Sequence, residues 1–268
     1  MKKLLIFSII LALILNIHSS IAAASELFTL TLYSDANLLS YYRLVDGADT
    51  EGIRNFTSTN IVFQAGKFGN AAFYNGTTAS SDTSTVFTEF SNATGSISIW
   101  FNTTSTGAVA LFQQTKINDA EANMVLLKMN GCAGGGDLCM VVSSGGTNLL
   151  VANESVTGWN NGAWHNFIFT VSSTGNLFYV DGVLRAVTYY TGNATTKVFF
   201  NSPVGANNWG LGSSMAGASR SNYFRGFIDD VAVFNRALTP VEVECIALGT
   251  NCADLPASVK KASIINFE

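Results

Sequence analysis

The sequence predicts an all-β protein, a two-sheet antiparallel sandwich with one short helix near its C-terminus. Short apolar and β-branched runs recur about every ten residues, and Gly, Asn and Ser stand between them. Charged residues make up only 12% of the chain, so Ser, Thr, Asn and Gly supply the polar surface. This composition is typical of a secreted β protein with many turns.

The first 24 residues predict a secretory signal peptide. Lys2 and Lys3 precede an apolar run of 14 residues at 4–17, and small residues follow at 22–24. The run is short for a membrane span, which favours cleavage after Ala24; an uncleaved N-terminal anchor is the alternative. After cleavage we expect no transmembrane span, one domain at 25–252 and an unassigned tail at 253–268.

The charge balance of the cleaved chain argues against nucleic acid as a partner. Loss of the two N-terminal lysines leaves 12 basic against 18 acidic residues, a formal net charge of −6. Proteins that bind nucleic acid usually present a basic surface to the phosphates.

Fourteen segments have the apolar, β-branched and aromatic content of strands. In chain order they are 27–33, 39–45, 71–74, 96–102, 109–113, 124–129, 138–142, 149–152, 164–171, 177–180, 183–187, 198–201, 209–212 and 227–234. Asp181 and Gly182 separate two of them, and an Asp-Gly pair between apolar runs is a strong signal for a type I′ hairpin. Three consecutive antiparallel strands are therefore expected between Trp164 and Val187.

The last strand and the helix after it have the clearest local signals. Strict alternation over 227–234 would place Asp230 on one face with Ile228, and Asp229 on the other with Val231. Thr239 then provides an N-cap hydroxyl, Pro240 the first helical residue, and a glutamate follows three residues after the cap. Gly249 predicts the helix end.

The four cysteines form two close pairs in the sequence. In an exported protein the local disulfides Cys132–Cys139 and Cys245–Cys252 are the simplest expectation, although four cysteines allow three connectivities. Neither pair has the spacing of a zinc site. We therefore interpret all four as structural.

Several segments together resemble the laminin G-like (LamG-like) jelly-roll family of the concanavalin A-like lectin/glucanase superfamily. They are LLSYYRLVDG at 38–47, GKFGNAAFYNG at 66–76, SISIWFN at 96–102, AWHNFIFTVSSTGNLFYVDGVL at 163–184 and FRGFIDDVAVFNRALTPVEV at 224–243. The chain departs from the pattern of that family near its first strand. The family usually has an aromatic residue followed two or three residues later by an aspartate, whereas this chain has Tyr42 and Asp46, and Asn55 replaces a second acidic residue.

This resemblance implies a jelly roll whose N- and C-terminal strands pair. It also implies binding of glycans or proteins at the surface and, in many members, one calcium ion. By resemblance Asp229 is the best metal candidate and Asp46 a possible second carboxylate, so Ca²⁺ is a possible cofactor. The alternative is that Asp229 accepts backbone amide hydrogen bonds and Asp230 pairs with Arg225 or Arg236.

No pattern in the sequence predicts catalysis. Glycosidases need two flanking carboxyl groups, and the superfamily's glucanase motif, glutamates around an aspartate on one strand, is missing. A serine or cysteine nucleophile would need an oriented histidine, and only His165 remains after cleavage, where it reads as a packing residue. We therefore predict that the protein is not an enzyme.

Candidate sugar-binding residues are aromatic side chains placed near amides in loops. Trp159 and Trp209 lie in WNNG and NNWG, Tyr223 is a weaker candidate, and Trp100 and Trp164 read as packing residues. The sequence thus predicts a secreted or cell-surface, non-catalytic module that binds carbohydrate or a glycosylated partner. The alternatives are an adhesion domain without a sugar site and, less favoured, a divergent glycoside hydrolase.

Overall fold

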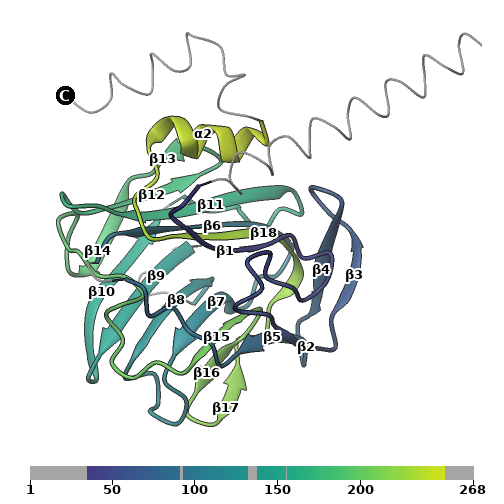
Figure 1. Cartoon of the computed structure of the whole chain (residues 1–268), viewed down its shortest axis with the longest axis horizontal. Helices are drawn as coiled ribbons and strands as arrows, with labels where there is room; N and C mark the ends of the chain where they lie inside the picture. The colour runs from purple at the N-terminus through teal and green to yellow at the C-terminus, as the bar shows by residue number, and fades with distance from the viewer. Residues whose placement is uncertain (1–34, 91–92, 132–137, 155, 251–268) are drawn as a thin grey trace, which may run out of the picture.

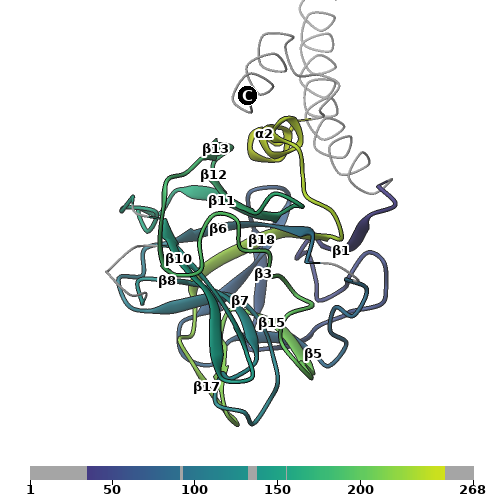
Figure 2. The same cartoon turned by 90° about the vertical axis from the view of Figure 1, so that its left-hand side faces the viewer.

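Two stacked antiparallel sheets, here called sheet A and sheet B, form the molecule, as the sequence predicts (Figure 1). The structure is a computed structural model that describes residues 35–90, 93–131, 138–154 and 156–250. The predicted signal peptide at 1–24, the strand predicted at 27–33 and the tail at 253–268 lie outside these residues. In both views helix α2 (Pro240–Leu248) lies on the outer side of sheet A, opposite the hairpin that projects beyond sheet B (Figures 1 and 2).

Sheet A has eight strands and contains both the first and the last strand of the described fold. In spatial order they are β13 (Val183–Leu184), β12 (Asn176–Val180), β11 (Trp164–Val171), β6 (Gly95–Thr103), β18 (Arg225–Phe234), β4 (Asn70–Asn75) and β3 (Val62–Ala65), with β1 (Leu38–Tyr42) also paired to β18. The pairing of β1 with β18 confirms the expected pairing of N- and C-terminal strands.

Sheet B also has eight strands, and a separate two-stranded hairpin projects from it. Its order is β14 (Val187–Thr191), β10 (Thr147–Glu154), β9 (Leu138–Ser144), β8 (Met124–Met129), β7 (Val109–Thr115), β15 (Asn208–Leu211), β5 (Ser80–Thr83) and β2 (Thr57–Thr59). The hairpin consists of β16 (Ser214–Ala216) and β17 (Ser219–Ser221).

An aromatic-rich core fills the space between the sheets. Phe101, Phe112, Phe167 and Phe169 are fully buried there, because alternate residues of each strand point to the same face. A second apolar cluster lies on the outer face of sheet A, where α2 packs over it. Its members are Leu38, Tyr41, Ile168, Tyr179, Ala232, Phe234, Leu238, Val243, Cys245 and Ile246.

Two of the predicted strands are wrong in detail. Residues 198–201 form no strand but lead into a turn, in which Ser202 N donates to Phe199 O at 2.9 Å, and the buried rings of Phe199 and Phe200 meet edge to face with their centroids 4.6 Å apart. The segment 183–187 is divided between β13 of sheet A and β14 of sheet B. The Asp181–Gly182 hairpin is confirmed, since both residues have positive φ, 52° and 78°.

Strand β18 occupies the middle of sheet A and has a bulge at its two aspartates. Along one edge it pairs with β6, and along the other it pairs first with β4 and then with β1. Asp229 pairs with Trp100 and Ala232 pairs with Ser98, so β18 advances three residues where β6 advances only two. Within this bulge Asp230 has a positive φ of 40°. The expected strict alternation is therefore wrong beyond the bulge, where Val231 and Val233 join Ile228 in the core.

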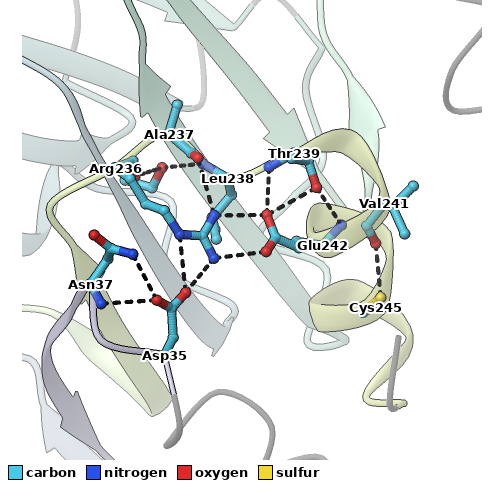
Figure 3. A network of polar contacts seen from close by, with 10 residues as sticks. Asp35, Asn37, Arg236, Ala237, Leu238, Thr239, Val241, Glu242 and Cys245 are labelled. Atoms are coloured by element: carbon cyan, nitrogen blue, oxygen red, sulfur yellow. Dashed lines mark hydrogen bonds and ion pairs between the residues drawn. The ribbon is translucent and has the colours of Figure 1, made fainter. Parts of the chain in front are cut away.

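Helix α2 confirms the capping signals in the sequence. The Thr239 hydroxyl accepts from the backbone N–H of Glu242, whose carboxylate accepts from the N–H of Thr239 in return, and Gly249 ends the helix in the left-handed conformation. Arg236 binds the Glu242 carboxylate through two nitrogens at 2.8 and 2.7 Å and also contacts Asp35 (Figure 3). This network links the helix to the segment that precedes β1.

Candidate functional site

Trp209 is a core residue, which corrects its prediction as a loop aromatic that meets a ligand. It lies on β15 with 0% of its surface exposed, and its ring packs against Phe87, Phe112 and Phe200. Its indole N–H donates to the hydroxyl of Tyr42 at 3.1 Å. The NNWG sequence resembles a loop, but Trp209 belongs to a short strand whose inward positions are Trp209 and Leu211.

Trp159 is half-buried in the connection between β10 and β11. Its indole N–H donates to Glu154 Oε2 at 2.9 Å, its ring meets His165 edge-on at 4.9 Å, and the Arg185 guanidinium carbon lies 4.9 Å from its centroid. Tyr223 is half-buried in the connection between β17 and β18. In the described part of the chain no contact joins Trp159, Trp209 and Tyr223 into one site.

His165 has the packing role that the sequence indicates. It is buried, and its ring nitrogens lie 2.8 Å from Asp181 Oδ2 and 3.1 Å from Asn161 Oδ1. These contacts hold the histidine between the Asp181–Gly182 turn and the connection before β11. No serine or cysteine nucleophile stands among these hydrogen-bond partners.

Asp229 is satisfied by backbone amides. Its Oδ2 accepts from the N–H groups of Lys67 and Phe68 at 2.9 and 3.1 Å, and its Oδ1 accepts from Asp230 N at 2.9 Å. The neighbouring carboxylate of Asp230 accepts instead from the Tyr41 hydroxyl, and not from Arg225 or Arg236. Burial, followed for Asp229 by the charge of Asp230, raises the pKa of both carboxyl groups.

These residues do not fit a calcium site. A calcium ion needs several oxygen ligands, whereas the oxygens of Asp229 face N–H donors. Asp46 is exposed, and its Oδ1 accepts from Ala48 N at 2.8 Å. In the described residues no three His, Cys, Asp or Glu side chains gather as a metal site would require.

Two of the four cysteines, Cys139 and Cys245, lie in the described residues. Neither Cys139 on β9 nor Cys245 on α2 is a free thiol. Their predicted partners, Cys132 and Cys252, lie outside the described residues. The pairings Cys132–Cys139 and Cys245–Cys252 therefore stay predictions.

A hollow of about 410 Å³ lies on the outer face of sheet B, across β8, β9 and β10. Its apolar lining includes Met124, Val141 and Val151, and its polar lining includes Lys128 and Asn148. Met124, Lys128, Val141 and Val151 point outward because the adjacent residues Val125, Leu127, Val142 and Leu150 belong to the core. Asn148 is exposed near the start of β10, before a register shift between Asn148 and Leu150. A volume of this size suits a small ligand.

The polar groups of the hollow come from side chains and from a loop with an unusual backbone. The Ser143 hydroxyl lies 2.9 Å from Asn148 Oδ1, which orients that amide at the surface. Glu121 enters from the loop between β7 and β8, where Asn118, Ala120 and Glu121 have φ of 70°, 53° and 68°. Positive φ at non-glycine residues costs energy and is enriched at binding sites.

Hydrogen bonds within the loop and to two neighbouring segments hold it in place. Asn118 N donates to Gly217 O of the β16–β17 hairpin at 3.2 Å. Asn123 donates to Asp119 Oδ2 at 2.8 Å, while its own Oδ1 accepts from Gly145 N at 2.9 Å. The loop is thus attached to the hairpin on one side and to the β9–β10 turn on the other.

The sequence did not reveal this hollow. Lys128 and Ser143 alternate with core residues on their strands, so a two-residue period could have placed them on an outward face. The same period would have placed Asn148 with the core residue Leu150, because it does not show the register shift between these two residues. The order β10-β9-β8 and the shape of the β7–β8 loop, which bring them together, depend on tertiary structure.

Comparison with known proteins identifies the family. A family model described as the concanavalin A-like lectin/glucanases superfamily (Laminin_G_3) matches residues 75–244, more than half of the chain. The chain belongs to this superfamily. Among curated protein sequences, none matches it.

Solved structures share the fold at low sequence identity. Domain 4 of AbnA, an extracellular GH43 arabinanase from Geobacillus stearothermophilus solved with arabinotriose, is 20% identical with a TM-score of 0.57, over 80% of this chain and 100% of that domain. The CBM40 of the Ruminococcus gnavus IT-sialidase, bound to α2,3-sialyllactose, is 17% identical with a TM-score of 0.50, over 71% and 98%. The botulinum neurotoxin serotype D binding domain is 13% identical with a TM-score of 0.56, over 80% and 52%.

Within the described residues, no helix has the length and apolar character needed to cross a bilayer.

Proposed function

We propose that this protein is a secreted, non-catalytic domain that binds carbohydrate in the hollow on sheet B. The observation that carries the proposal is the hollow itself, because its lining combines amide and charged groups with apolar side chains. Sugars offer the matching chemistry, with hydroxyl groups for polar side chains and C–H faces for apolar ones. Related folds solved with arabinotriose and sialyllactose support this ligand class.

The lining of the hollow also supports a binding role without catalysis. Hydrolysis of a glycosidic bond uses two carboxyl groups on opposite sides of the bond. Glu121 is the carboxylate that lines the hollow, and the described lining offers no second one. Release of reducing ends from any polysaccharide by the purified protein would contradict this part of the proposal.

Calcium is not part of the proposed binding mechanism, because the donors around Asp229 do not suit a cation. Calcium binding itself stays a prediction from the family resemblance. A calcium-dependent rise in melting temperature, reversed by a chelator, would support it.

Glycan-array screening followed by calorimetry with the best oligosaccharide tests the site. We expect Asn148→Ala and Lys128→Ala each to weaken binding about threefold to tenfold, since each removes a hydrogen-bonding group from the hollow. Asn70→Ala and Lys197→Ala are matched controls at exposed positions outside the hollow and should bind as wild type does. Equal affinity in all four variants would exclude this hollow as the site.

Absence of any glycan ligand, together with binding to an unglycosylated protein partner, would favour the alternative of an adhesion domain.

A further inference from the structure

The outer face of sheet A has a row of large side chains that cross five strands in register. Trp164 pairs with Asn102, Asn102 with Phe227, Phe227 with Phe73, and Phe73 with Val62. Paired residues stand side by side on the same face of a sheet. The row faces outward, because the adjacent residues Phe101, Ile228 and Tyr74 are core residues. We call Trp164, Asn102, Phe227, Phe73 and Val62 the aromatic row.

The three rings of the row form a continuous surface. The centroids of Trp164 and Phe227 lie 6.1 Å apart, and those of Phe227 and Phe73 lie 5.1 Å apart. The ring planes are tilted by 50° and 55° in these two pairs. The three rings therefore do not lie in one plane. Such a surface suits a single flexible sugar chain better than the flat face of a crystalline polysaccharide.

Helix α2 does not cover the row. The apolar cluster under α2 contains none of its members. All three aromatic side chains keep part of their surface exposed, and Val62 is 56% exposed. The outward neighbours Gln64 and Asn75 are polar, whereas Trp100, two residues before Asn102 on β6, is a buried aromatic residue.

Two cations flank the row on opposite sides. Arg225 is exposed two residues before Phe227 on β18 and pairs across the sheet with Asn75. On the side toward α2, the Lys67 ammonium lies 4.7 Å from the centroid of the Trp100 ring. Neither Arg225 nor Lys67 forms an ion pair with any residue that the structure describes.

We propose that the aromatic row, with Arg225 and Lys67, is a second binding site, for a single chain of an acidic glycan. Aromatic faces pack against the C–H faces of sugar rings, and the two cations attract carboxylate or sulfate groups along the chain. The site shares only its ligand class with the proposed function and uses none of the residues of the hollow. The domain would then bind glycans on two opposite outer faces.

The test uses a panel of immobilised oligosaccharides that carry uronate, sialic acid or sulfate groups, together with neutral oligosaccharides of equal length. We expect at least one acidic class to bind, with an affinity that falls as salt concentration rises. Arg225→Glu and Lys67→Glu should each weaken this binding about tenfold or more, because each replaces an attraction with a repulsion. Lys197→Glu is the matched charge control and should have little effect.

Trp164→Ala should weaken the same binding about tenfold. Because Trp164 is half-buried, the melting temperature of the Trp164→Ala protein is measured as well. If this variant does not fold, the charge reversals at the exposed residues Arg225 and Lys67 still test the proposal. Acidic glycan binding that persists in Asn148→Ala but is lost in Arg225→Glu supports the row independently of the hollow. The proposal is overturned if no acidic glycan binds, if neutral glycans bind the Asn148→Ala protein as tightly as acidic ones do, or if only the variants of the hollow lose acidic glycan binding.

Discussion

Asp229 and Asp230 are two adjacent buried carboxyl groups, and each accepts hydrogen bonds from a different part of the sheet. They lie where β18 stops pairing with β4 and begins to pair with β1. Each aspartate forms hydrogen bonds with a different neighbouring segment. Asp229 accepts from the backbone of the β3–β4 turn, whereas Asp230 accepts from Tyr41 on β1. The sequence shows that these aspartates need partners, but the bulge that points them at separate strands arises from the pairing of β18 with three others.

This pair predicts an unusual dependence of stability on pH. Because the pKa of each carboxyl is raised on folding, the native state binds more protons than the unfolded chain above about pH 4. The free energy of unfolding should therefore fall as the pH rises from about 5 to 8, by about 2 kcal/mol if one proton is lost. Asp230→Asn should reduce this slope, because its amide stays neutral and can still accept from Tyr41.

Urea unfolding at pH 5 and pH 8 measures the effect. Asp46→Asn, at an exposed aspartate, is the control and should keep the wild-type slope. An Asp230→Asn protein with an unchanged slope would show that this pair does not titrate in the range.

Among the secondary-structure elements, those with capping or turn residues within a few positions of each other were predicted best. The helix at 240–248 and the Asp181–Gly182 hairpin follow from capping and turn chemistry, and both are confirmed. The strands β2 and β5 were not predicted, because TST and SSDT lack apolar content. They form strands since neighbouring strands of sheet B offer them hydrogen bonds, which no local pattern records.

The N-cap of α2 gives a prediction at this scale. Thr239→Ala removes the hydroxyl that accepts from Glu242 N and should lower the free energy of unfolding by about 1 kcal/mol. Thr239→Ser keeps a hydroxyl and should cost clearly less. Chemical unfolding of the three proteins at one pH compares them. Equal stability of the Ala and Ser variants would mean that the cap contributes little beside the contacts of Glu242 with Arg236.

At the scale of the whole molecule, the fold class was predictable and the binding surfaces were not. Regular alternation and a recognisable set of segments were enough for the sandwich. Trp209 was misplaced because a short strand and a loop of similar composition look alike. The hollow and the aromatic row each combine residues from at least three strands, so they depend on strand order.

The central place of β18 predicts the effect of truncation. This strand pairs with β1, β4 and β6, so a chain ending before residue 225 lacks the partner of three strands. We expect such a fragment to show no cooperative thermal unfolding and no dispersed NMR spectrum. A chain ending at residue 250 should show both. Cooperative unfolding of the shorter fragment would contradict the central role of β18.

The same placement affects the order of events during synthesis. Since β18 comes much later in the chain than β1 and β4, these two strands can pair with it only after the segments between them have been synthesised. Until then the growing chain cannot close its sandwich.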